Sequence, residues 1–218
     1  MYNPEPTLRE RRRERTWNAI HQASVDLVRE KGLKKTTTDE IAEIAGISPR
    51  TFFNYFATKE DAVLGLREPV VSAEILEADK ARQDFYIFER VVHLLLDVVL
   101  QAMPESKYKK YRELAEEYPE LRHRLKVLML KSEQVVEEFL RTIDWATFAR
   151  AGRRGEFSFV PEGSEPQGAN WNLQRASVMI ASSVLRYMDF SAGLPEGEVR
   201  NELIRDSVRI FQQLLRED

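Results

Sequence analysis

Residues 38–56 read TDEIAEIAGISPRTFFNYF, a pattern typical of two short helices joined by a tight turn. Gly46 can adopt the left-handed backbone that such a turn needs, and Ser48 followed by Pro49 is a strong start signal for the second helix. The apolar residues of this segment have the spacing of a helix-turn-helix core: Ile41, Ala42, Ala45, Ile47 and Phe52. The segment therefore predicts a helix-turn-helix, with an ordinary helical hairpin that ends at a glycine as the alternative.

The rest of the chain also follows the period of an α-helix, and no segment has the bounded alternation of a β-strand. Capping boxes at Thr7 with Glu10 and at Thr37 with Glu40 mark two helix starts. Four glycines and two prolines in residues 151–169 predict a long loop. We therefore expect an all-α fold with helices over residues 8–31, 38–45, 49–56, 59–66, 85–103, 107–118, 119–150, 171–192 and 196–216.

The composition narrows the classes of function. The 218 residues include no cysteine and three histidines, which excludes a disulfide framework, a cysteine-based zinc site and a cysteine nucleophile. No apolar run is long enough for a membrane span, and the arginine-rich start lacks the apolar segment of a secretion signal. We therefore expect a cytoplasmic protein that uses no cofactor and no metal.

The net charge of −3 conceals an uneven distribution of charged residues. Residues 1–67 contain 12 basic and 10 acidic side chains, whereas the remainder contains 21 basic and 26 acidic ones. Five arginines precede Trp17, where the apolar stripe of the first helix begins: Arg9, Arg11, Arg12, Arg13 and Arg15. With no core beneath them, they are expected to project beyond the domain. Contact with DNA phosphates or with the minor groove would explain the cluster, and a solvated helix end is the alternative.

A resemblance to a known family rests on Thr37-Thr38 and on IAEIAGISPRTFFNYFATKEDAV at residues 41–63. Over about residues 10–66 the sequence is similar to the DNA-binding domain of the TetR family of bacterial transcriptional regulators. The resemblance implies an all-helical homodimer, with a three-helix DNA-binding domain over residues 1–66. Residues 67–218 would then form a helical bundle that dimerises and binds a ligand.

The resemblance also implies that residues 49–56 are the recognition helix, and that Thr38 and Tyr55 meet phosphates. By their chemistry, arginine can pair with guanine, asparagine with adenine, and an apolar ring with the methyl group of thymine. A lysine at a helix start favours a phosphate. The predicted DNA-binding residues are Thr38, Ser48, Pro49, Arg50, Thr51, Phe53, Asn54, Tyr55, Lys59, Arg11, Arg12 and Arg15. The alternative for each of them is a cap or a solvated surface.

The C-terminal part suggests a dimer and a ligand pocket. Small residues in the helix at 171–192 let another helix approach closely, and the last helix carries a broad apolar stripe. The resemblance implies that these two helices pair with their copies in a dimer, with an intramolecular core as the alternative. A pocket for an apolar or aromatic effector would be lined by adaptable side chains, which can equally be core: His93, Met103, Tyr108, Tyr111, Met129, Trp145 and Trp171.

The predicted function is therefore a DNA-binding transcriptional regulator, most often a repressor in this family, that a small molecule releases from its operator. Within the same class, the alternative is a DNA-binding dimer without an effector, whose C-terminal half only dimerises or binds proteins. A helical enzyme is the alternative from another class. The sequence contains no glycine-rich phosphate loop, no HExxH and no GxSxG, so we do not expect an enzyme.

Overall fold

The computed structural model describes residues 7–103, 113–114, 116–161, 163–164, 171–192 and 197–214. Within these ranges the regular elements are helices, and the β-structure is limited to an isolated bridge between Ile143 and Phe159. The expected all-α fold is thus confirmed. The chain divides into two compact units. The first comprises residues 1–67 and 103–126, and the second comprises residues 68–102 and 127–218, whereas the sequence suggested a division after residue 66.

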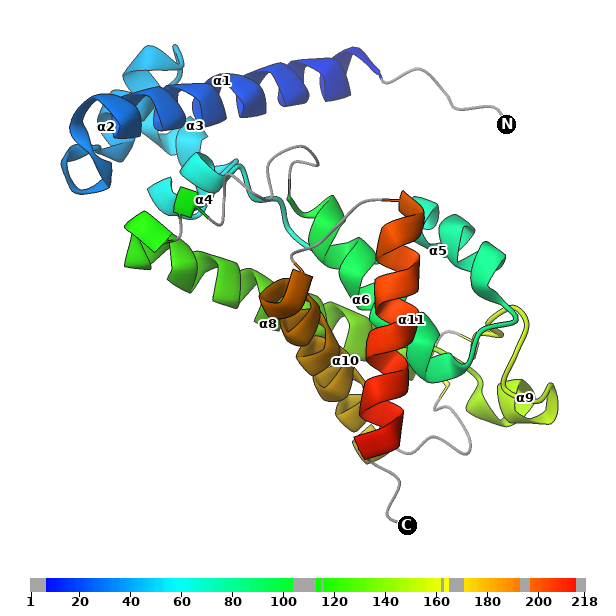
Figure 1. The fold of residues 1–218 in the computed structure, drawn as a ribbon. Coiled ribbons are helices and arrows are strands. Elements are labelled where there is room, and N and C mark those ends of the chain that lie inside the picture. The colour runs from blue at the N-terminus through cyan, green and yellow to red at the C-terminus, as the bar shows by residue number, and fades with distance from the viewer. Residues whose placement is uncertain are drawn as a thin grey trace. The chain divides into compact units, whose positions relative to one another are not determined.

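The first unit contains the helix-turn-helix (Figure 1). Its elements are α1 (Leu8–Lys31), the short 3-10 helix η1 (Leu33–Lys35), α2 (Thr38–Ile44), α3 (Pro49–Phe53), α4 (Lys59–Leu64) and the start of α8 (Pro119–Arg141). Helix α1 packs against α2 and α4, and α2 packs against α3. The side chains between these helices form one apolar core: Trp17, Ile20, Ala23, Leu27, Ile41, Ala42, Phe52, Phe56 and Ala62.

The turn between α2 and α3 follows from Gly46. Its φ of 68° lies in the left-handed region, and the Ile47 N–H donates to the Ala42 carbonyl over 2.9 Å. The Gly46 N–H donates to the Glu43 carbonyl over 3.1 Å, which completes the two hydrogen bonds of a Schellman motif. The predicted helix-turn-helix and the left-handed glycine are both confirmed.

Two helices of the first unit are shorter than predicted. Helix α3 ends at Phe53 rather than at residue 56, because the N–H groups of Asn54 and Tyr55 donate to carbonyls only three residues back. Helix α4 ends at Leu64 because Gly65 takes a left-handed conformation, with φ of 61°. A Cβ atom at Gly65 would lie 3.0 Å from the ring of Trp17, so glycine also allows a close approach to α1.

The second unit is built around α6 (Ile87–Gln101), which is buried along most of its length. Helix α6 packs against α5 (Ala73–Asp79), α10 (Trp171–Ala192) and α11 (Gly197–Leu214) (Figure 1). The other elements are the 3-10 helix η2 (Lys80–Arg82), the rest of α8, and α9 (Trp145–Arg150). Among the described residues, no helix combines the length and apolarity that crossing a bilayer would require.

The single helix predicted over residues 119–150 is wrong, because two helices occupy this range. Helix α8 stops at Arg141, and α9 starts at Trp145 with Asp144 as its cap. The break is held by backbone pairing with the following loop. The Asp144 N–H donates to the Ser158 carbonyl over 2.8 Å, and the Val160 N–H donates to the Thr142 carbonyl over 2.9 Å.

Candidate nucleic-acid interface

Arg50 and Phe53 on α3 are exposed, as is Asn54, the residue that caps the C-terminus of α3. Phe53 is 57% exposed although its side chain is large and apolar, whereas the neighbouring Phe52 is buried in the core. The two rings meet edge to face with their centroids 5.3 Å apart. Neither the guanidinium of Arg50 nor the amide of Asn54 pairs with another residue that the structure describes. An arginine, an amide and an apolar ring therefore lie exposed close together in the chain.

Other predicted DNA-binding residues of this segment have local structural roles. The Ser48 hydroxyl accepts the Thr51 N–H over 3.1 Å and lies 2.8 Å from the Thr51 hydroxyl, so both side chains fix the start of α3. Pro49 occupies the first helical position. Thr38, at the start of α2, is half-buried, and the half-buried Tyr55 packs against the core. DNA contact by these residues remains a prediction.

Lys59 holds the backbone of the segment between α1 and α2. Its Nζ donates to the carbonyls of Leu33, over 2.8 Å, and of Thr36, over 2.9 Å. These bonds take two of the three donors of the ammonium group and tie the start of α4 to η1. A substitution at Lys59 would therefore change the loop as well as any phosphate contact, which remains a prediction.

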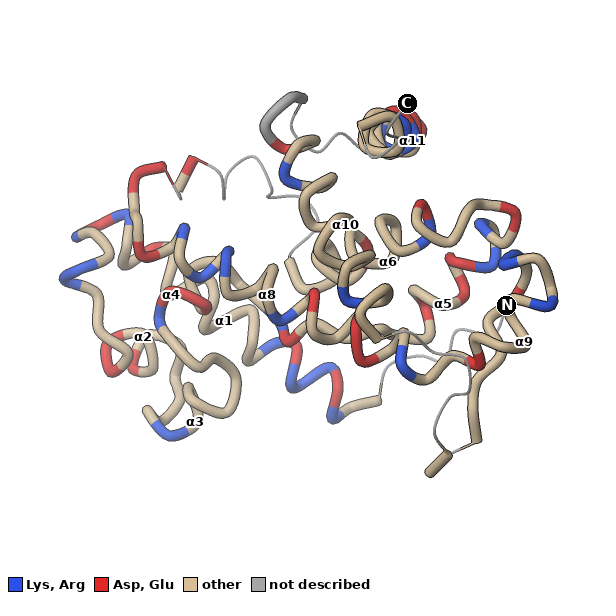
Figure 2. The backbone as a smooth tube through the Cα atoms, turned by 90° about the horizontal axis from the view of Figure 1, so that it is seen from below, with Lys and Arg blue, Asp and Glu red and all other residues tan. Residues whose placement is uncertain are grey.

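Arg11, Arg12 and Arg15 lie exposed in the first turns of α1, as do Arg9 and Arg13. Figure 2 shows the basic positions that gather in this part of α1. The first buried side chain of α1 is that of Trp17, so the arginines lie beyond the core of the unit, as expected. Glutamates interrupt the cluster at Glu10 and Glu14, which leaves a surplus of positive charge.

An ion pair that the sequence did not suggest holds α4 to α8. The carboxylate of Asp61, on α4, is buried and accepts bonds from Nε and Nη2 of Arg124, each over 2.8 Å. The two parallel bonds orient both groups. The two residues lie 63 positions apart, and no local pattern in the sequence links them.

Replacing Arg124 by alanine is expected to lower the free energy of unfolding by about 1–3 kcal/mol, because Asp61 then remains buried without its cation. Urea unfolding followed by circular dichroism measures this loss. His123→Ala, at an exposed position of the same helix, is the control and should cost less than about 0.5 kcal/mol. Equal stability of the two variants would contradict a structural role for the pair.

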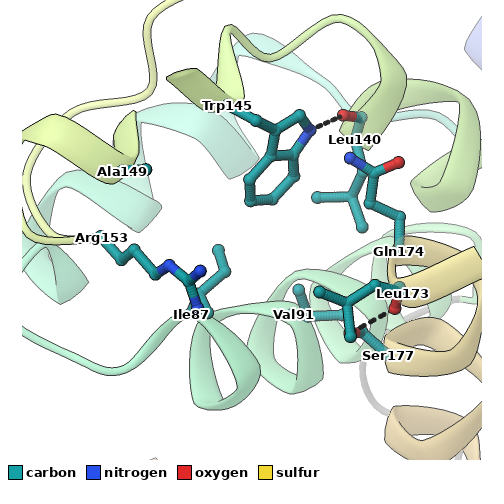
Figure 3. Close-up of a pocket in the computed structure, with 9 residues that line it drawn as sticks. All are labelled: Ile87, Val91, Leu140, Trp145, Ala149, Arg153, Leu173, Gln174 and Ser177. Atoms are coloured by element: carbon teal, nitrogen blue, oxygen red, sulfur yellow. Dashed lines mark hydrogen bonds between the residues drawn. The ribbon is translucent and has the colours of Figure 1, made fainter. Parts of the chain in front are cut away.

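A pocket lies in the second unit, with a cavity volume of about 120 Å³ (Figure 3). Trp145 forms one wall, and its Nε1 donates to the Leu140 carbonyl over 2.9 Å. The lining comes from α6, α8, α9, the turn after α9, and α10: Ile87, Val91, Leu140, Trp145, Ala149, Arg153, Leu173, Gln174 and Ser177. The walls are mostly apolar, and Arg153 and Gln174 add two strongly polar groups.

Of the residues predicted to bind a ligand, Trp145 lines this pocket and the other described ones do not. Trp171 is 41% exposed, with the guanidinium of Arg141 5.6 Å from its ring centroid. Met103 is buried and Met129 half-buried, while Tyr108 and Tyr111 lie outside the described residues. For these residues ligand contact stays a prediction.

His93 is buried on α6 beside Phe85, with ring centroids 5.8 Å apart. Burial, together with the positive charges of Arg82, Arg205 and Arg200, lowers the pKa of His93 to about 3. The imidazole is therefore neutral at pH 7, and its Nε2 has no hydrogen-bond partner among the described residues. His93 is buried in the core and does not line this pocket, and ligand contact by His93 stays a prediction.

A buried arginine fixes the loop next to the pocket. Arg90, on α6, is 1% exposed and pairs through Nε and Nη2 with the buried carboxylate of Asp79. Its Nη1 donates to the Gly155 carbonyl over 2.7 Å, and its guanidinium lies 3.9 Å from the centroid of the Phe157 ring. The sequence signal for this network is a single arginine in a helix with an almost continuous apolar run after it, which predicts burial but not the partners.

Comparisons with known proteins agree with this site. Residues 20–64 match the family model of the bacterial regulatory proteins, tetR family. The HTH-type transcriptional regulator TcmR of Streptomyces glaucescens is 39% identical over 59 residues, which are 27% of this chain and 26% of that relative. The chain therefore matches about a quarter of the relative's length.

Two solved structures are similar over most of the chain. One is FadR of Thermus thermophilus, a TetR family transcriptional repressor in complex with lauroyl-CoA, with 19% identity and a TM-score of 0.41 over 93% of this chain and 96% of that one. The other is the fatty acid degradation regulator FadR of Bacillus halodurans, with 16% identity and a TM-score of 0.38 over 93% and 97% of the two chains.

Over its helix-turn-helix the chain matches the TetR family of bacterial regulatory proteins. The resemblance stated from residues 41–63 is thus confirmed.

Proposed function

We propose that this protein is a sequence-specific DNA-binding transcriptional regulator, a repressor that a small molecule releases from its operator. The observation that carries the proposal is the exposed group of Arg50, Phe53 and Asn54 on the second helix of a helix-turn-helix and its C-cap. Helices of this kind present their N-terminal residues to base edges in the major groove. Arginine can form two bonds to guanine there, and asparagine can form two bonds to adenine.

Pairing of two copies would supply the two reading helices that a symmetric operator needs. Helices α10 and α11 each keep apolar side chains exposed along one stripe, which supports a dimer interface. Met179 on α10 is 58% exposed, and the other exposed members are Tyr187, Val199, Ile210 and Leu214. Burying such a surface against a second copy is favourable because it removes apolar area from water.

The pocket in the second unit supports control by a small molecule. Helix α8 would transmit the effect of ligand binding to α4. Leu140 near the end of α8 lines the cavity, and Arg124 near its start holds Asp61 of α4. An effector must bind the form with low DNA affinity more tightly, and DNA then weakens effector binding by the same factor. A regulator without an effector would need no cavity, so the pocket favours the form with an effector.

Selection of bound duplexes from a random DNA pool tests this proposal. We expect an enriched sequence with two half-sites related by a dyad, bound roughly 10³-fold or more tightly than random DNA at the same salt concentration. Recovery of an unenriched pool would contradict sequence-specific binding.

Asn54→Ala is expected to weaken operator binding by about 1–3 kcal/mol and to leave random DNA binding nearly unchanged, because a base contact is lost. Arg12→Ala is the matched comparison. Arg12 lies in the exposed cluster of α1, and its removal should weaken both kinds of DNA alike and flatten the salt dependence. Fluorescence anisotropy at several salt concentrations measures both effects. Equal losses on operator and random DNA for Asn54→Ala would overturn its assignment.

A further inference from the structure

We infer that the pocket of the second unit takes a small aromatic acid, with its carboxylate at Arg153 and a hydroxyl group at the far end against the amide of Gln174. This inference rests on the proposed function, since it names the class of effector that the pocket would admit. The two polar groups lie on opposite sides of the cavity, and the ring of Trp145 forms part of the wall from one to the other (Figure 3).

The apolar walls determine the body of the ligand. Trp145 faces the aliphatic side chains of Ile87, Val91 and Leu173 across the cavity (Figure 3). The indole N–H is already bonded to the Leu140 carbonyl, so the ring offers the pocket only its apolar surface. A cavity of about 120 Å³ is close to the roughly 150 Å³ of an apolar cavity that holds benzene. One aromatic ring therefore suits the space between these walls.

Gln174 is the built polar element of the pocket. The residue is 5% exposed, and its Oε1 is buried without a hydrogen-bond partner among the described residues. Figure 3 draws the amide nitrogen on the side of Trp145, so the nitrogen is the atom of this side chain nearest the pocket as drawn. Rotation of the amide by 180° exchanges its donor and its acceptor. A ligand hydroxyl can donate or accept, and it therefore fits Gln174 in either orientation.

Arg153 is the charged residue among those that line the pocket, and its guanidinium points toward Ile87 (Figure 3). Among the described residues, no carboxylate pairs with it. Its φ of 59° makes it the non-glycine residue with a left-handed backbone in the described ranges. Glycine would adopt this conformation at lower cost, and unfavourable backbone conformations concentrate at binding sites. An unpaired guanidinium at the pocket attracts an anion, and a carboxylate matches its planar geometry.

The backbone around Arg153 fixes where the guanidinium starts. The Arg153 N–H donates to the Phe148 carbonyl, and the Gly152 N–H donates to the Ala149 carbonyl, each over 3.0 Å. These bonds close α9 with a Schellman motif, so the position of Arg153 follows that of the helix that carries Trp145 and Ala149. A ligand that pairs with Arg153 and packs on Trp145 therefore contacts one rigid element at two points.

Calorimetry on the full chain with three matched probes tests the inference. We expect 4-hydroxybenzoate to bind most tightly, benzoate about 10-fold more weakly, and neutral 4-hydroxybenzamide about 5-fold more weakly. In Gln174→Leu, or in Gln174→Met as a second variant, the preference for 4-hydroxybenzoate over benzoate should disappear. In Arg153→Gln, the preference for the acid over the amide should disappear.

Arg154→Gln is the control, because Arg154 lies 4.9 Å from the ring centroid of Tyr86 and does not line the pocket. It should keep the order of the three probes. The inference is overturned if no probe binds, if the wild type does not distinguish the probes, or if the Gln174 and Arg153 variants keep the wild-type preferences.

Operator binding is measured separately, so that the two proposals can fail independently. If 4-hydroxybenzoate binds with the expected preferences but does not change operator affinity, the pocket assignment is supported and release by an effector is contradicted. If the operator is bound and no probe binds, the pocket assignment fails and DNA binding is unaffected.

Discussion

Replacing Arg90 by methionine is expected to lower the free energy of unfolding by about 3–5 kcal/mol, because the carboxylate of Asp79 then stays buried without a cation. Arg90 is enclosed on every side that the structure describes. Its partners are both oxygens of Asp79, the Gly155 carbonyl and the face of Phe157. Water cannot replace the lost cation easily, since Asp79 is only 4% exposed.

Urea unfolding followed by circular dichroism measures this loss. The double variant Arg90→Met with Asp79→Leu should recover most of the stability, because removing both partners leaves no buried charge. Arg82→Met is the control, since the Arg82–Asp97 pair is partly exposed and its loss should cost about 1 kcal/mol. If the double variant were no more stable than Arg90→Met, the unpaired carboxylate would not be the cause.

Introducing a charge into the α11 stripe is expected to separate the proposed dimer and to weaken operator binding by about 100-fold or more. Ile210 is 37% exposed on the stripe, so Ile210→Glu should leave the fold of one copy intact while placing a charge in the proposed interface. Two linked reading heads gain about 10²–10⁴ in affinity from binding as one unit, and separated copies lose that gain.

Sedimentation measures the mass in solution, and fluorescence anisotropy measures operator affinity. Leu130→Glu is the matched control, because Leu130 is an exposed leucine on α8, outside the α10 and α11 stripes. It should keep both the dimer and the operator affinity. A dimeric Ile210→Glu with unchanged affinity would contradict the assignment of the interface to α11.

The elements that sequence reasoning predicted well depend on residues close together in the chain. The capping boxes at Thr7 and Thr37 are present, and Gly46 forms the turn. Each of these features is set by side chains and backbone within four or five residues, so a local pattern is enough to predict it. Helix α1 has the predicted bounds for the same reason, since a capping box starts it and Gly32 ends it.

The elements that it missed depend on distant partners. The break between α8 and α9 needs the backbone pairing of Ile143 with Phe159, and no feature of residues 119–150 alone announces that contact. The ion pair of Asp61 with Arg124 likewise joins residues far apart in the chain. The sequence shows that such residues are charged, but it does not show which of them form ion pairs with one another.

The candidate sites divide in the same way. The exposed side of α3 could be predicted because the helical period separates Phe52 from Arg50 and Phe53 once the helix is known. The pocket could not be predicted, because its lining comes from four helices and a turn. The sequence also does not distinguish an amphipathic residue that lines a pocket, such as Trp145, from one that does not, such as His93. Gln174 was missed because only the packing of α10 shows that its amide is buried.

Base reading by α3 is tested most directly by repeating the selection from random DNA with Arg50→Ala beside the wild type. The guanidinium of Arg50 is exposed at the start of α3, where a guanine contact would form. We predict that the variant loses its preference for one G·C pair in each half-site, which corresponds to about 1–3 kcal/mol of binding free energy. Its preferences at the other positions of the enriched DNA sequence should stay the same. The same enriched sequence with unchanged preference at every position would contradict base reading by Arg50.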